Sequence, residues 1–210
     1  MRVIRLALLT TCVTAAALAI SAGIAGASRG IEPAARAVRA SGTFKFREIN
    51  GNEVVCPMTL DAEIHRTIPK TVGALTGTVT ELEVEEEECE TTGVSSRLVF
   101  SALRLPWHIR YVSFQGSLPR IRSIRVTALG VNLLFRITII EFFRAGCEYR
   151  TDLQLDFEIN STSEVERVRI VPGQRVPLER ALEGAEFCPT QGEPGGDFAP
   201  PAPVRIRLLP

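Results

Sequence analysis

Apolar and polar residues alternate with a period of two along much of this chain. The clearest example is the stretch 152–159, which reads DLQLDFEI. In an extended chain these apolar and polar side chains take opposite faces. Such alternation is typical of a strand in an antiparallel sheet that is buried on one face and wet on the other.

The same reading predicts about ten short strands, separated by turns rich in Gly, Pro and Asn. They cover residues 43–47, 55–64, 77–88, 94–103, 107–114, 121–128, 131–140, 149–159, 165–171 and 204–209. No long helical pattern competes with them. We therefore expect an all-β fold, an antiparallel β-sandwich or barrel of about ten strands.

Three segments interrupt this pattern. Residues 28–40 (SRGIEPAARAVRA) are small and polar and predict a flexible leader. Residues 179–186 predict a helical turn. Residues 189–203 (PTQGEPGGDFAPPAP) hold five prolines and three glycines and predict an extended surface loop. The expected organisation is one β domain over 41–210 that includes this loop.

The first 27 residues have the layout of a secretory signal peptide. A short basic region with Arg2 and Arg5 precedes an uncharged apolar run that ends in Ala25-Gly26-Ala27. The alternative is an uncleaved anchor, because the apolar run is nearly long enough to span a bilayer. Either way the sequence predicts a secreted or otherwise extracytoplasmic protein.

The cysteine count supports export and predicts disulfides. Four cysteines follow the predicted signal peptide, namely Cys56, Cys89, Cys147 and Cys188. An even number in an exported chain favours disulfides over catalytic thiols, and no C-x-x-C pair suggests zinc. Three connectivities are possible. We favour Cys56–Cys89 and Cys147–Cys188, because cysteines close in sequence more often lie on paired strands.

Charge and composition exclude several classes of function. Without Arg2 and Arg5, 24 − 2 = 22 basic residues face 24 acidic ones, so the mature chain is nearly neutral. Nothing global attracts it to nucleic acid. No phosphate-binding or nucleophile-elbow motif occurs, and the two histidines, His65 and His108, cannot form a three-His metal site. We expect no catalytic residues, no metal and no cofactor.

Residues 81–90, ELEVEEEECE, form a run that is rich in glutamate. Alternation places Glu81, Glu83, Glu85 and Glu87 on one face, with Leu82 and Val84 toward the core. A solvated strand edge is the favoured interpretation. Calcium binding is the alternative, although carboxylates along one strand do not converge. A third possibility is pairing with the arginines of RIRSIR (120–125), within the molecule or between molecules.

The most apolar stretch after the leader is VNLLFRITIIEFF, residues 131–143. A central buried strand explains it most simply. The alternative is an apolar ligand pocket lined by Leu133, Phe135, Ile137 and Ile139.

One pattern resembles a known group of proteins. Leu105-Pro106-Trp107-His108-Ile109-Arg110-Tyr111, followed by Phe114-x-Gly116-x-Leu118-Pro119, is similar to an uncharacterised family of small secreted bacterial β proteins. The likeness covers about residues 41–150, and the Glu-rich run before Cys89 is not part of it. The resemblance implies an exported, disulfide-bonded β scaffold and supplies no activity or ligand. Independently of it, Trp107 at a strand start is expected to be a packing anchor.

Together these features predict a non-enzymatic exported domain, a structural or interaction module at the cell envelope whose partner the sequence does not identify. A small β-barrel that binds an apolar ligand or lipid is the alternative.

Overall fold

The computed structural model describes residues 30–49, 51–85, 89–92, 97–117, 120–140 and 143–209. The signal-peptide prediction, residues 1–27, lies outside these ranges. Within them the secondary structure is almost entirely β, so the predicted all-β class is confirmed. None of the described residues forms a helix of the length and apolar character needed to cross a membrane.

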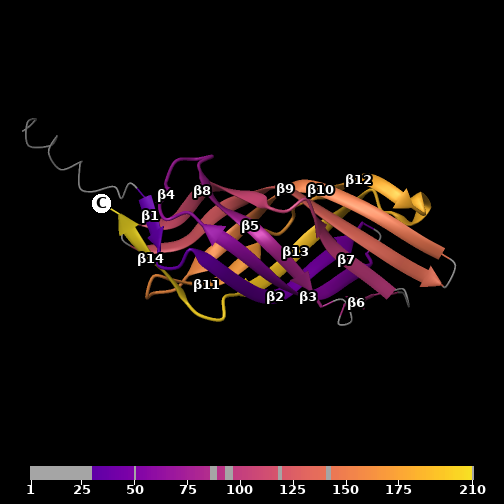
Figure 1. Cartoon of the computed structure of the whole chain (residues 1–210), viewed down its shortest axis with the longest axis horizontal. Coiled ribbons are helices and arrows are strands. Elements are labelled where there is room, and N and C mark those ends of the chain that lie inside the picture. The colour runs from indigo at the N-terminus through magenta and orange to yellow at the C-terminus, as the bar shows by residue number, and fades with distance from the viewer. Residues whose placement is uncertain are drawn as a thin grey trace, which may run out of the picture.

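Fourteen strands and one short 3-10 helix make up the described chain (Figure 1). They are β1 (Gly30–Pro33), β2 (Ala37–Glu48), β3 (Glu53–Ile64), β4 (Ile68–Pro69), β5 (Leu75–Val84), β6 (Glu90–Thr91), β7 (Arg97–Leu103), β8 (Trp107–Ser117), β9 (Arg120–Ile140), β10 (Phe143–Ile159), β11 (Glu164–Ile170), β12 (Val176–Glu183), η2 (Ala185–Phe187), β13 (Gln191–Ala199) and β14 (Val204–Leu209).

The antiparallel sheet closes on itself. Following hydrogen-bonded neighbours leads from β2 through β3, β5, β8, β9, β10, β11 and β13 back to β2. β12 takes the place of β11 beside the other half of β10. The chain therefore forms a closed barrel, and β1, β4 and β14 extend the sheet at one end. Of the two predicted architectures, the pairing supports the barrel.

β9 and β10 form the longest pair, and they run side by side along much of the molecule (Figure 1). The sequence predicts two strands where β9 is one, because Gly130 reads as a break. Gly130 has a φ of 60°, which favours glycine, and the β9–β10 register shifts opposite it, between Thr151 and Leu153. The strand therefore bends at Gly130 without ending.

The alternation predicted from the sequence agrees with which side chains point into the barrel. Leu153 and Leu155 of β10 are buried, while Asp152 is exposed on the other face. From the opposite wall, Phe46 of β2 packs against Phe135 and Tyr149, with ring centroids 4.6 and 4.9 Å apart. These aromatic contacts join strands that face each other across the interior, so the core fills the barrel.

The flexible leader predicted at 28–40 is wrong for the residues that the structure describes. Gly30–Pro33 form β1, which pairs with β14, and Ile31 is completely buried. The segment from Ala37 onward begins β2. Its small residues suggested flexibility, but strand pairing and burial of Ile31 hold it in place.

The predicted loop at 189–203 is also wrong in its central part. Gln191–Ala199 form β13, which pairs with β2 from Gly192 to Ala199. Glycine is required here for close approach, because a Cβ on Gly192 would collide with the ring of Phe46. Glycine in this strand therefore reflects packing and not a turn.

The helical turn predicted at 179–186 is displaced. β12 continues to Glu183, and the 3-10 helix covers Ala185–Phe187. Gly184, with a φ of 54°, separates the two elements.

Both favoured disulfides are confirmed. Cys56 of β3 bonds to Cys89, just before β6, and Cys147 of β10 bonds to Cys188, just after the 3-10 helix. Cys56, Cys147 and Cys188 are buried. Each bridge therefore ties a short peripheral segment to a barrel strand.

Candidate functional site

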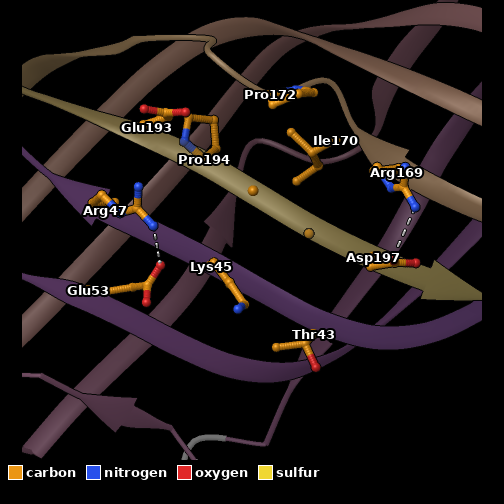
Figure 2. Close-up of a pocket in the computed structure, with 12 residues that line it drawn as sticks. Thr43, Lys45, Arg47, Glu53, Arg169, Ile170, Pro172, Glu193, Pro194 and Asp197 are labelled. Carbon is orange, nitrogen blue, oxygen red and sulfur yellow. Dashed lines mark hydrogen bonds and ion pairs between the residues drawn. The ribbon is translucent and has the colours of Figure 1, made fainter.

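A groove of about 300 Å³ crosses the outer surface of the barrel above β13. Figure 2 shows Lys45 and Arg47 of β2 on one side of β13, with Ile170 and Pro172 on the other. Its floor is the backbone around Gly195 and Gly196, between Glu193 and Asp197. We call this depression the β13 groove.

The groove exists because one side chain is missing. Gly195 pairs with the exposed Lys45, so its Cα points a hydrogen outward where other residues carry a side chain. A Cβ built there would find only the Cβ of Lys45 within 4 Å, at 3.8 Å. Glycine leaves this stretch of backbone open to a ligand.

Along the second wall of the groove, the pairing of β13 with its neighbours β11 and β12 is interrupted. β11 pairs with β13 only at Asp197 and Phe198, and β12 pairs with it only at Gln191 and Gly192. Between these contacts the chain turns through residues 171–175 beside β13. The N–H of Gly173 donates to Oε1 of Glu193 at 3.1 Å, which ties this turn to the strand.

Most of the groove's charges are internally balanced. Arg47 pairs with Glu53 at 3.4 Å, and Arg169 lies 3.7 Å from Asp197 while also pairing with Glu158 at 2.9 Å. Lys45 is exposed and forms no ion pair with any residue that the structure describes. Its ammonium group is therefore the charge most open to a ligand.

The depression continues along β13. A second hollow of about 250 Å³ adjoins the first and shares Arg47 and Glu193 with it. It extends past Ile49 and Arg175, and the side chain of Ile49 is 66% exposed. The two hollows together form an elongated surface, which suits an extended ligand better than a compact one.

The interior of the barrel is more tightly filled. Two wholly apolar cavities measure about 50 and 40 Å³. Small-molecule sites usually have several hundred Å³. The described interior therefore has the character of a packed core.

The four residues predicted to line an apolar pocket differ in how deeply they are buried. Leu133 and Phe135 are buried in the barrel, and Leu133 borders the 40 Å³ cavity. Phe135 packs against other aromatic rings. Ile137 is half-buried, and the side chain of Ile139 lies outside the described part. The first two serve as core, and the pocket itself stays a prediction.

A buried carboxylate lies outside the core, on β10. Glu148 is only 2% exposed, and it accepts hydrogen bonds from Asn132 Nδ2 at 2.6 Å and from Arg180 at 2.9 Å. The hydrogen bond from Asn132, with help from Arg180 and Arg104, lowers the pKa of Glu148 against the opposing effect of burial. Glu148 therefore stays ionised at neutral pH and links β9, β10 and β12.

The acidic run occupies a strand face, as predicted. Glu81, Glu83 and Glu85 are exposed, while Leu82 and Val84 pack against the core. Glu86–Glu88 lie outside the described residues. Across the described part of the chain, no group of three or more His, Cys, Asp or Glu side chains could hold a metal ion.

Within this acidic run, Glu83 pairs with an arginine of β2 and not with one of the RIRSIR arginines. Arg39 lies 2.8 Å from Glu83 and 3.3 Å from Asp61. β8 separates β5 from β9, so the two charged stretches are not strand neighbours. Arg125 pairs instead with Asp156 at 2.6 Å. Among the described residues, the possible pairing of the two runs across neighbouring strands of one molecule is therefore not formed.

We expect calcium to have no effect on this face. Replacing Glu81, Glu83 and Glu85 with Gln should change the free energy of unfolding by about 1 kcal/mol or less, because the side chains are solvated. Thermal melts of the parent and of the triple variant, each with and without calcium, provide the measurement. A calcium-dependent rise in Tm that the triple variant loses would contradict this expectation.

The histidines and Trp107 lie apart from the groove. Nδ1 of His65 lies 3.1 Å from the carbonyl oxygen of Leu75, and His108 is exposed. Trp107 is 5% exposed and its Nε1 donates to the carbonyl of Leu103 at 3.1 Å. Burial with a satisfied N–H confirms its role as a packing anchor.

Comparison with known proteins adds no assignment. No protein-family model, curated protein or solved structure matches this chain. The resemblance around Leu105–Tyr111 stays a prediction, and function rests on the geometry.

Sequence reasoning missed the β13 groove. Its residues come from β2, β3, β11, β13 and the turn after β11, and most of the floor lies in the segment predicted to be a loop. The pair Gly195-Gly196 between charged residues was the available signal, because glycine inside a strand often marks a close backbone approach.

Proposed function

We propose that this chain is an exported, non-enzymatic β domain that acts as an interaction module at the cell envelope through the β13 groove. One observation carries the proposal: the β13 groove, at about 300 Å³, is open to solvent, whereas the two apolar cavities inside the barrel measure about 50 and 40 Å³. A barrel with a filled interior offers its outer surface for recognition.

The disulfides support an extracytoplasmic location. Two bridges indicate an oxidising environment, because thiols are kept reduced in most cytosols. Secretion through a signal peptide at residues 1–27 is the simplest route to that environment and forms part of the proposal.

The chemistry of the groove favours an extended polypeptide segment as its ligand. Side chains of both signs line it together with Ile170, Pro172 and Pro194. Peptides present the same mixture of charged and apolar groups along an elongated shape. Lys45 would receive a carboxylate, and the glycine floor would admit the peptide backbone.

A photocrosslinking experiment in the native envelope tests this proposal. A photoreactive amino acid replaces Thr43, which lines the groove. We expect a discrete crosslinked protein. Adding Gly195→Val should remove most of that product, because the new side chain occupies the groove. The structure predicts little strain, since the Cβ of residue 195 has space and Gly195 is not among the positive-φ glycines.

Ala199→Val is the matched control. Ala199 is exposed on the same strand and does not line the groove. Both valine variants should unfold within about 0.5 kcal/mol of the parent, as surface substitutions usually do. Absence of a crosslinked protein, or equal loss of product in both variants, would refute recognition by the groove.

A further inference from the structure

The turn between β10 and β11 carries an acceptor motif that the proposed groove does not use. Residues 160–162 read Asn-Ser-Thr, the pattern N-x-[ST] of N-linked glycosylation. Ser161 and Thr162 are exposed, and Asn160 is half-buried.

The turn holds the asparagine by its oxygen. Oδ1 of Asn160 accepts hydrogen bonds from the backbone N–H groups of Thr162 and Glu164, each at 3.0 Å. The opposite end of the amide is held loosely: Nδ2 lies 3.5 Å from Oε2 of Glu164. The atom that would carry a sugar is therefore the least constrained part of the side chain.

The threonine hydroxyl is in position to act on that amide. Oγ1 of Thr162 lies 2.7 Å from Oδ1 of Asn160 and 2.8 Å from Oε2 of Glu164, and its one proton can be given to either oxygen. Donation to Oδ1 draws electron density toward that oxygen and makes the protons on Nδ2 more acidic, which eases the loss of one of them. A serine could make the same hydrogen bond, whereas an alanine could not.

We infer that Asn160 is the attachment site of an N-linked glycan. The donor class is an oligosaccharide linked through pyrophosphate to a polyprenyl lipid, and a membrane transferase of the export route supplies the catalysis. The Nδ2–C1 bond forms as the bond from C1 to the pyrophosphate oxygen breaks. The lipid pyrophosphate leaves with the bonding electrons, and the amide proton passes to a base of the transferase.

The fold leaves room for such a group. The turn joins two strands at the surface, and Asn160 does not line the β13 groove. The inference rests on the export part of the proposed function, because the donor lipid and transferase face the extracytoplasmic side.

Mass spectrometry of the protein recovered from its native cells is the test. We expect the peptide that contains Asn160 to carry added saccharide mass. Thr162→Ala should remove this mass, and the matched variant Thr162→Ser should keep it. Asn160→Asp provides a second route, since it keeps an oxygen for the two backbone N–H groups and removes the nitrogen that is modified.

The outcomes separate this inference from the proposed function. An unmodified peptide in protein with two intact disulfides would overturn the glycan alone. An unmodified peptide in protein with four free thiols would overturn both the glycan and the exported location. Saccharide that persists in Thr162→Ala or Asn160→Asp would place the modification elsewhere and overturn the assignment to Asn160.

Discussion

Replacing Trp107 with alanine is expected to lower the free energy of unfolding by about 3–5 kcal/mol, the usual range for a large aromatic residue removed from a core. The indole is 5% exposed at the start of β8 and lines the smaller apolar cavity with Val79 and Ala128. Truncation would enlarge that cavity in a wall that cannot collapse freely, because β8 is hydrogen-bonded on both edges. Denaturant unfolding curves provide the measurement.

Two variants control for other causes. His108→Ala removes the exposed neighbour of Trp107 and should change stability by about 0.5 kcal/mol or less. Trp107→Phe keeps most of the apolar volume and loses the hydrogen bond to Leu103, so its cost should fall between the two. A Trp107→Ala protein as stable as the parent, yet defective in crosslinking, would make the indole part of a binding surface.

The double variant Cys147→Ala/Cys188→Ala is expected to lose about 2–5 kcal/mol of stability. The bridge closes a loop with a sequence separation of 41 residues, for which chain entropy alone predicts about 4 kcal/mol. It also secures the segment after β12, where Phe187 is 41% exposed and the 3-10 helix has no buried residues. Few apolar contacts would replace the bridge there.

Unfolding curves of the double variant and the parent under non-reducing conditions measure this effect. The corresponding variant Cys56→Ala/Cys89→Ala is the comparison, with a separation of 33 residues and a similar entropic contribution of about 4 kcal/mol. If neither bridge contributes, all curves will coincide, and the fold would then depend on its core alone.

Local pattern was a reliable guide wherever one face of a strand is buried. The run DLQLDFEI forms part of β10 with its apolar side chains turned inward. Phe44 and Phe46 of β2 are buried in the core of the barrel, as their alternation indicates. The Glu-rich strand also turns its acidic side chains to solvent. Side-chain alternation is a property of the extended backbone, so a sequence alone displays it.

Segments without alternation were misread. β13 contains three glycines and a proline, and its strand state depends on pairing with β2. β1 is four residues long and is held by β14 from the other end of the chain. The stabilising partners are distant in sequence, and no local pattern reports them.

By itself, therefore, the sequence determined the β class and the inward and outward faces of the regular strands, and it favoured the cysteine pairing that the structure confirms. Each of these follows from backbone geometry or from closeness along the chain. Only the tertiary structure decided that the sheet closes into a barrel, that a Gly-rich segment serves as one of its strands, and that a groove lies above Gly195. The reason is physical: closure and the groove arise from which strands meet and where a side chain is missing between them, and both depend on residues far apart in the sequence.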